Sequence, residues 1–254
     1  DPSNGCVAFN PFGLNAPSDA ALDWTRGTST SVSTLDMDNV AANISGDLFE
    51  GWAGPISVAL GAEYRSEDAL VTADPLSKNF AFIFGNPQPW SGGVSVKEGY
   101  VEANVPLLRD TTGFEELNLN GAARLTDYST SGSIWSWKLG LSWVPFDGLR
   151  VRGTRSRDIR APNVNELYSG GRQFTGTITD PFNGNIVVNG IPVIAGGNPG
   201  LAPEIANTLT LGVVIQPNQV PGLSFSVDFY DIKVANAIAT IAPQQLVDQC
   251  FAGN

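Results

Sequence analysis

One group of polar side chains within the segment 155–168 has the residue types to bind a ligand: Arg157, Arg160, Asn163 and Glu166. An arginine guanidinium can hold a carboxylate or a phosphate through two parallel hydrogen bonds, so these residues could contact a polar or anionic ligand. The alternative is that Arg157, Asp158 and Arg160 form an ion-pair cluster that anchors a loop. Pro162 would then end a strand because proline cannot donate to the ladder. The sequence leaves both interpretations open.

A second candidate surface lies at about 68–93, where aromatic side chains stand among prolines: Phe80, Phe82, Phe84 and Trp90, with Pro87 and Pro89. Aromatic faces line many small-molecule sites, and they suit sugars or aromatic iron chelates. Phe82 and Trp90 are therefore ligand candidates, together with Tyr168 and Arg172 at the start of a long glycine-rich segment. The alternative is that the aromatic side chains only pack neighbouring loops together.

The composition excludes several kinds of chemistry. The 254 residues include no histidine, which removes the Ser-His-Asp and Cys-His nucleophile systems and the commonest transition-metal ligand. Two cysteines are too few for a zinc cluster, and no phosphate-binding glycine loop is present. The net charge of −11 repels nucleic acid, and no apolar run approaches the ~18 residues of a membrane helix. We therefore expect no enzyme, no bound cofactor or metal, and no nucleic-acid partner.

Alternation of apolar and polar residues with a period of two predicts that strands position these side chains. The pattern is sharpest at 135–143, where one face carries Trp135, Trp137, Leu139, Leu141 and Trp143. The other face of that segment is polar or small. Seven further segments show the pattern, at about 33–48, 54–67, 94–105, 117–126, 149–158, 203–216 and 223–236. We therefore predict about eight strands, many of ten or more residues.

The connections between these strands are of two kinds. Short, turn-rich connections fall at about 49–54, 109–113, 145–148 and 217–222, and long ones at about 68–93 and 159–202. In an antiparallel meander all the short turns lie at one end of the sheet and both long loops at the other, with 129–133 as a tight exception among them. Long strands with one apolar face and this asymmetry are typical of an outer-membrane β-barrel. Such a sheet must close because lipid offers no hydrogen-bond partner to the backbone.

Two further observations bear on the choice between a membrane barrel and a soluble protein. Trp52, Trp143 and Phe146 stand beside short turns, where they suit the aromatic girdle of a membrane boundary. A soluble sandwich or barrel also alternates, with its apolar face turned inward and usually with shorter strands. Alternation does not distinguish inside from outside. A self-contained small soluble β-barrel or sandwich that acts as a binding module therefore stays the alternative.

Several segments resemble one family. Residues 155–168, which read Arg-Ser-Arg-Asp-Ile-Arg-Ala-Pro-Asn-Val-Asn-Glu-Leu-Tyr, resemble a segment of TonB-dependent outer-membrane receptors. After a long loop, residues 197–204, Gly-Asn-Pro-Gly-Leu-Ala-Pro-Glu, are similar to the segment that opens the next strand in those receptors. Segments 95–102, 127–129 and 225–233 also resemble their strands. The resemblance covers essentially the whole chain.

The resemblance implies a fold and a function. Such receptors have a TonB box and a plug domain before a barrel of about 22 strands. It therefore implies that residues 1–254 are a partial barrel domain of about eight antiparallel transmembrane strands with long extracellular loops, with the plug domain absent. It also implies energy-coupled uptake of a scarce nutrient such as a siderophore, cobalamin or a carbohydrate across the bacterial outer membrane. The expected partners are outer-membrane lipid, the small-molecule nutrient, and TonB only through the missing N-terminal part.

Cys6 and Cys250 allow at most one disulfide within the chain. The resemblance implies pairing of each with a near neighbour, which can lie outside residues 1–254, and a Cys6–Cys250 bridge stays the alternative. Asn189-Gly190 lies between two β-branched runs, which predicts the turn of a small hairpin there. Residues 243–250 are expected to form a short helix with Pro243 in its first turn.

Overall fold

The fold is given by a computed structural model, which describes residue 3 and residues 5–253. The strands in this part of the chain are β1 (Ser31–Gly51), β2 (Gly54–Ala73), β3 (Trp90–Thr111), β4 (Phe114–Tyr128), β5 (Gly132–Phe146), β6 (Leu149–Arg160), β7 (Arg172–Asp180), β8 (Ile186–Ala195), β9 (Glu204–Ile215) and β10 (Phe225–Ala235). The helices are α1 (Asp19–Thr25), α2 (Pro75–Lys78), α3 (Val164–Tyr168), α4 (Pro243–Ala252) and the 3₁₀ helix η2 (Pro181–Asn183). Among the described residues, none of these helices has the length and apolar character needed to cross a membrane.

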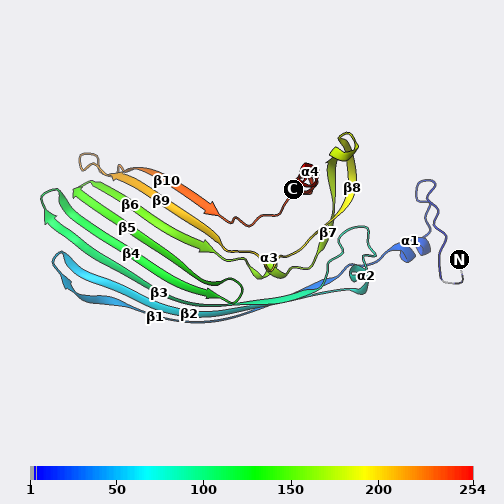
Figure 1. Ribbon diagram of the computed structural model, residues 1–254, viewed down its shortest axis with the longest axis horizontal. Helices are drawn as coiled ribbons and strands as arrows, with labels where there is room; N and C mark the ends of the chain where they lie inside the picture. The colour runs from blue at the N-terminus through cyan, green and yellow to red at the C-terminus, as the bar shows by residue number, and fades with distance from the viewer. Residues whose placement is uncertain (1–2, 4, 254) are drawn as a thin grey trace.

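Eight of the strands form a single antiparallel sheet in the order β1-β2-β3-β4-β5-β6-β9-β10. Figure 1 shows this sheet as one long curved layer. Each of the eight strands predicted from alternation is present, so the all-β antiparallel class is confirmed. Within the described part of the chain, β1 and β10 each keep one unpaired edge and the sheet does not close.

The connections sort as predicted. Short turns join β1 to β2, β3 to β4 and β5 to β6 at one end of the sheet, where the β9–β10 connection also lies. The connections that carry α2, α3 and the β7–β8 hairpin lie at the opposite end, with the tight β4–β5 turn as the exception (Figure 1). The strands are longer than predicted: β2 runs to Ala73 and β3 begins at Trp90, which shortens the first loop.

The strand pairing defines two faces of the sheet, because directly paired residues of antiparallel strands point to the same side. One row of paired residues crosses all eight strands: Ile44, Leu60, Val101, Ala123, Trp137, Arg157, Asn207 and Lys233. We call the face that carries this row the outer face. The opposite face carries Glu98, Arg124 and Lys138, and we call it the inner face.

The hairpin in the β6–β9 connection is present, but the prediction that it turns at Asn189-Gly190 is wrong. The turn lies at η2, where the Asp180 carboxylate accepts hydrogen bonds from the Phe182 backbone N–H at 3.0 Å and the Asn183 amide at 2.6 Å. Gly190 lies within β8 with a φ of 73°, next to the register shift opposite Gly176 and Thr177. A glycine with positive φ is what a β-bulge of this kind needs, so the dipeptide makes a bulge instead of a turn.

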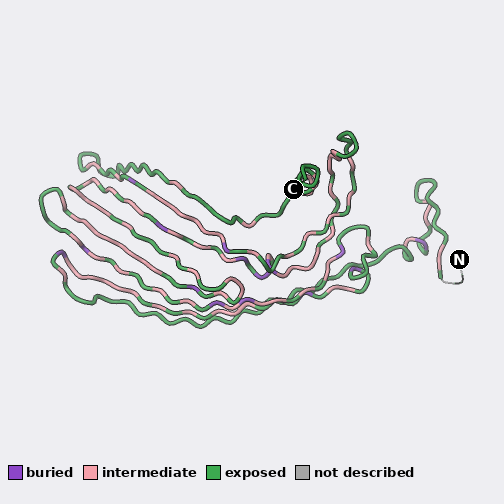
Figure 2. Tube along the Cα trace, viewed as in Figure 1, coloured by how far each residue is buried: buried purple, intermediate pink, exposed green. Residues whose placement is uncertain are grey.

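Few residues are buried, and most of these lie near the loop end of the sheet, as Figure 2 shows. The main buried cluster consists of Ala69, Val94, Val96, Val164 and Leu167. The first three belong to the inner face of β2 and β3, and the last two belong to α3. The core of the described chain is therefore the place where α3 packs against the inner face. The helix predicted at the C-terminal end is confirmed as α4, with Pro243 in its first turn.

Candidate functional site

The helix α3 is fixed by its own N-terminus. The Asn163 side chain accepts a hydrogen bond from the Glu166 backbone N–H at 2.8 Å, and the Glu166 carboxylate accepts one from the Asn163 backbone N–H at 2.9 Å. This reciprocal capping box satisfies two backbone donors that a helix start leaves unpaired. Pro162 precedes the cap, in agreement with the expectation that it ends the strand. Asn163 and Glu166 are thus both part of the local fold of the loop.

Arg160, the last residue of β6, joins α3 to two other segments. Its guanidinium donates to both oxygens of Glu204 at 2.7 and 2.9 Å, and to both oxygens of Glu166 at 3.0 and 3.1 Å. Glu204 also accepts a hydrogen bond from the Ile238 backbone N–H at 2.7 Å. The hydrogen bonds from Arg160 hold the pKa of Glu166 below its ordinary value of 4.5. An ion-pair anchor of the loop is therefore present, but its members differ from those of the predicted cluster: Arg160 pairs with Glu166 and Glu204, whereas Asp158 accepts a hydrogen bond from Ser156.

The docking of α3 also places Tyr168 and Trp90. Leu167 is fully buried against the inner face, and Trp90 and Tyr168 pack around the same cluster. The Tyr168 ring lies so close to Gly92 of β3 that a side chain at that position would clash with it. Tyr168 therefore holds the loop against the strand, and Trp90 stands at the point where β3 leaves the loop.

The connection between β2 and β3 is tied to the hairpin through Asn86. This fully buried side chain accepts from the Phe82 backbone N–H at 3.1 Å and donates to the Phe82 carbonyl at 2.7 Å. It also donates to the Gln173 side chain on β7 at 2.8 Å. The Phe82 ring lies against Gly27, in the segment that follows α1. Hydrogen bonds, chiefly from the Ser77 hydroxyl, lower the pKa of Asp74, the cap of α2, to about 2.

A cavity of about 520 Å³ lies between these loops at the loop end of the sheet. Among the predicted ligand candidates, Trp90 and Arg172 line it. Arg172 is exposed, and within the described residues no ion pair or hydrogen bond holds its guanidinium. The remaining polar lining was not predicted from the sequence: Ser31, Ser33, Gln88, Asn165 and Ser169. These residues come from segments far apart in the chain. The only signal in the sequence that could have grouped them is that their segments lie at the same end of the predicted sheet.

Arg157 lies elsewhere. It is directly paired with Trp137 and Asn207 on the outer face, whereas Arg160 and Glu204 lie on the inner face. Residues three positions apart on a strand point to opposite sides, so the structure does not bring Arg157 together with the other candidates. The predicted site therefore divides into an anchor (Arg160, Asn163, Glu166), packing residues (Tyr168, Phe82) and the cavity. Ligand contact stays a prediction, and the geometry favours Arg172 and Trp90 for it.

The inner face below the loops is a polar groove of about 320 Å³. Arg124 donates to Glu98 at 2.9 Å, and its guanidinium lies 5.1 Å from the centre of the Tyr100 ring. Thr126, which is almost fully buried, donates to the same carboxylate at 3.4 Å. Paired charged side chains of this kind are compatible with a water-filled barrel interior.

The outer face is apolar toward the short turns and becomes polar toward the loops. The first polar residues of the outer face on the loop side are Asp38, Ser66, Lys97, Asp127, Ser133, Arg155, Asn207 and Asp231, one on each strand of the sheet. Relative to the row through Ile44 and Lys233, Asp38 lies six residues toward the loops and Asp231 two residues toward the turns. The boundary therefore crosses the sheet at a slant.

The slant has the size expected of tilted barrel strands. A shift of eight residues corresponds to about 27 Å along the strands, against about 34 Å for seven inter-strand spacings. The boundary thus makes an angle of about 39°, within the tilt of roughly 35–45° that strands of membrane barrels adopt. Leu60, Leu139 and Leu211 of the outer face are about half exposed, at 49%, 51% and 52%. A soluble module with this face turned inward would bury them instead.

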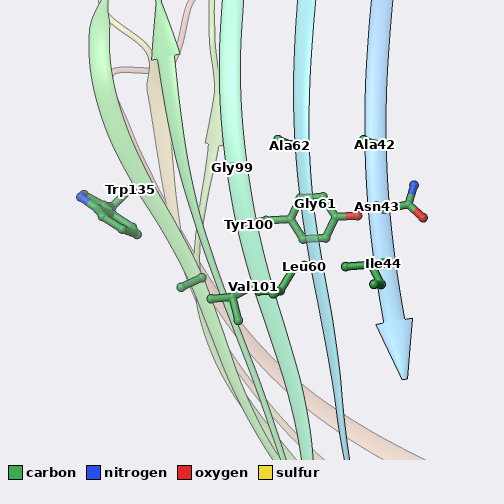
Figure 3. Close-up of a pocket in the computed structure, with 11 residues that line it drawn as sticks. Ala42, Asn43, Ile44, Leu60, Gly61, Ala62, Gly99, Tyr100, Val101 and Trp135 are labelled. Atoms are coloured by element: carbon green, nitrogen blue, oxygen red, sulfur yellow. The ribbon is translucent and has the colours of Figure 1, made fainter. Parts of the chain in front are cut away.

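The outer face also carries a hollow of about 620 Å³, shown in Figure 3. Small residues form its floor, and Ile44, Leu60, Val101 and Trp135 stand around it. Tyr100 extends across Gly61 in the same view. The residues that line the hollow from the outer side are apolar in the described part of the chain, so it suits a hydrocarbon chain better than a polar ligand.

One protein family matches almost the entire sequence. A family model described as TonB dependent receptor-like, beta-barrel, matches residues 6–251. The chain belongs to the TonB-dependent receptor family. Proteins of this family are bacterial outer-membrane proteins that act as transporters and not as enzymes. A search of curated protein sequences finds no match.

Solved receptors share the fold of this TonB-dependent receptor chain. The siderophore receptor PirA from Pseudomonas aeruginosa matches with a TM-score of 0.55 and 19% identity, over 79% of this chain and 32% of that one. A mutant of the Pseudomonas aeruginosa ferric enterobactin receptor PfeA in complex with enterobactin gives 0.58 and 17%, over 80% and 27%. A double mutant of the Serratia marcescens hemophore receptor HasR, with HasA and heme, gives 0.55 and 13%, over 80% and 34%. The chain thus spans about a third or less of each.

The two cysteines are not joined to each other. Cys250 is exposed on α4, and no disulfide joins it to Cys6, although both residues lie in the described part of the chain. Pairing with a residue outside 1–254, which the family resemblance implies, stays a prediction.

Proposed function

We propose that this chain forms part of the barrel of an outer-membrane receptor that imports a scarce small-molecule nutrient, such as a siderophore, cobalamin or a carbohydrate. The observation that carries the proposal is the slanted apolar band of the outer face, which gives the sheet the tilt of a membrane barrel. Outer-membrane lipid would surround this band. The inner face would border the wet path of the nutrient, and no catalysis is involved.

We propose further that residues 1–254 are a partial barrel domain. The unpaired edges of β1 and β10 support this, because an open sheet edge cannot face hydrocarbon without leaving backbone groups unsatisfied. Strands outside residues 1–254 would pair with both edges. Contact with TonB and gating by a plug domain would then be properties of the receptor outside this chain.

The cavity between the loops is the proposed capture site. Its volume of about 520 Å³ lies within the range of roughly 300–1,000 Å³ typical of small-molecule sites. Trp90 offers an aromatic surface at one side, and Arg172 offers a guanidinium that no acidic side chain of the described residues neutralises. An anionic ligand with a flat aromatic or chelate surface would match both groups.

Uptake by living cells tests this proposal. A strain without the receptor gene would carry the full-length receptor as wild type, Arg172→Ala or Arg26→Ala, and uptake of radiolabelled ferric enterobactin, cyanocobalamin and a maltodextrin would be measured. We expect the wild type to raise uptake of one probe, and Arg172→Ala to reduce it roughly tenfold through the loss of a charge-assisted contact.

Arg26 is the matched control, because it is an exposed arginine of the loop-end segment that lies outside the cavity. Uptake unchanged by Arg172→Ala at equal receptor levels would contradict the capture site. A receptor found in the soluble fraction would contradict the transport function itself.

A further inference from the structure

Two arginines of β6 point away from the inner face. Arg155 is directly paired with Leu139 and Leu209, and Arg157 with Trp137 and Asn207. In the described residues neither guanidinium takes part in a salt bridge or a hydrogen bond, and the Arg157 Nε atom is shielded from solvent without a partner. The other arginines of the same strand, on the inner face, all have partners.

The acidic groups nearest in sequence and register do not neutralise this pair. Asp158 lies on the inner face and accepts a hydrogen bond from Ser156 at 2.7 Å. On the outer face, Asp231 of β10 lies 3.3 Å from Lys233, which belongs to the same strand. The outer face of β6, β9 and β10 at this level therefore carries three cations, Arg155, Arg157 and Lys233, and one anion, Asp231. A local excess of positive charge stands out in a chain whose net charge is −11.

The two arginines lie at the loop-side edge of the apolar band of the outer face. Arg155 is the first polar outer-face residue of β6 on the loop side, directly above Gly153 and Val151 of the apolar band. Trp135 and Trp137 of the neighbouring strand stand beside them, 57% and 40% exposed. Tryptophan and arginine together at the edge of an apolar band are placed at the level of lipid headgroups, where the arginine stem can lie along hydrocarbon and the guanidinium can reach the interface.

We infer that Arg155 and Arg157 bind the phosphate of a phosphorylated lipid in the outer leaflet, whose acyl chains lie on the apolar band. This inference rests on the proposed function, because it requires the outer face to contact the membrane. A guanidinium fork matches phosphate oxygens geometrically, and the headgroup level offers phosphate as its anion. Lys233 and Asn207 extend the same polar rim toward β10.

Native mass spectrometry of the full-length receptor tests the inference. Phosphatidic acid would be titrated as the probe, with diacylglycerol as the same lipid without phosphate and inorganic phosphate as the same anion without lipid. The variant Arg155→Gln with Arg157→Gln would be compared with Lys138→Gln with Arg150→Gln, which removes equal charge from the inner face of β6 and its neighbour β5.

We expect the outer-face variant to bind phosphatidic acid roughly 10- to 30-fold more weakly than wild type, since each basic residue near a lipid surface contributes about 1 kcal/mol. The inner-face variant should bind like wild type. Equal affinity of both double variants, equal binding of diacylglycerol, or displacement of the lipid by equimolar inorganic phosphate would each overturn the inference.

Failure of this inference is distinguishable from failure of the proposed function. Cell fractionation and the uptake assay are carried out on the same outer-face variant. If the wild type and the variant both insert into the outer membrane and import the nutrient, and the wild type binds phosphatidic acid no more tightly than the variant, only the lipid site is overturned. A receptor that does not reach the outer membrane overturns both.

Discussion

The two faces of β6 treat the same residue type in opposite ways. On the inner face Arg152 donates to Asp228 at 2.8 Å, and Arg160 is held by Glu204 and Glu166. On the outer face Arg155 and Arg157 have no partner among the described residues. The inner-face arginines therefore join parts of the chain to one another, and the outer-face arginines do not.

A sequence motif that lies on a strand is therefore divided between the two faces of the sheet. The segment 155–160 is continuous in sequence, but successive side chains point to opposite sides of the sheet. Its odd positions lie on the outer face. Its even positions lie on the inner face, where Ser156 donates to Asp158 and Arg160 anchors the loops. The environment of each side chain also depends on its position along β6, because the apolar band ends at Arg155 and the loops begin after Arg160.

The largest expected effect comes from a charge in the middle of the outer band. Leu139 lies midway between Trp135 and Trp143 on the outer face of β5. We expect Leu139→Arg to destabilise the folded barrel by about 2–4 kcal/mol, the cost of arginine at the bilayer midplane. Urea unfolding of the full-length receptor in phospholipid vesicles measures this change in the free energy of unfolding.

The matched control for that variant is Asn120→Arg. Asn120 is paired with Gly140, the neighbour of Leu139, but lies on the inner face. An inner-face arginine remains in water, so the free energy of unfolding should change by less than about 0.5 kcal/mol. Equal losses for the two variants would show that the faces are assigned wrongly.

A smaller effect is expected from adding one methyl group on each face. The Tyr100 ring crosses Gly61 on the inner face so closely that a Cβ there would overlap it, and Arg124 in turn lies over that ring. Gly99 on the outer face has only the Gly61 carbonyl near its Cβ position, at 3.9 Å. We expect Gly61→Ala to cost about 1–3 kcal/mol in the free energy of unfolding and Gly99→Ala almost nothing. The same urea titration tests both, and a larger loss for Gly99→Ala would contradict the comparison.

Much of the eight-stranded sheet could be predicted from the sequence, for a physical reason. A strand with an apolar environment on one face and water on the other alternates in sequence, so segments such as 135–143 are recognisable as strands. The ends of β2 and β3 were not predicted, because beyond the apolar band both faces meet water and the alternation fades around Asp68. The separation of Arg157 from Arg160 could have been predicted, since three positions on a strand reverse the face.

The candidate site was predicted only in part. Trp90 and Arg172 line one cavity, but its serines and Asn165 come from segments that only the folded loops bring together. The docking of α3 on Val94 and Val96 is a long-range contact with no periodic signal in a helix of five residues. The hairpin turn was misplaced because Asn-Gly also suits a bulge, and the Asp180 cap provides the competing turn.

The smallest expected effect is a pH dependence of the α3 anchor. The hydrogen bonds from Arg160 lower the pKa of Glu166 from its ordinary value of 4.5, so the docked loop is favoured fully above that value. This contribution is lost as the pH falls through the lower folded-state pKa, because protonation removes the charge that Arg160 holds. Protection factors of the Leu167 and Ser169 amides, whose hydrogen bonds close α3, should therefore fall as the pH is lowered below 4.5.

Arg160→Gln sharpens that measurement, because it removes the main cause of the shifted pKa and leaves the capping box with Asn163 in place. Protection in this variant should start lower at neutral pH and change less over the same range. Arg157→Gln carries the same loss of charge on the outer face and should follow the wild-type profile. If Arg157→Gln flattened the profile as much as Arg160→Gln, the anchor would depend on net charge and not on the inner-face contacts, and the division between the two faces would fail.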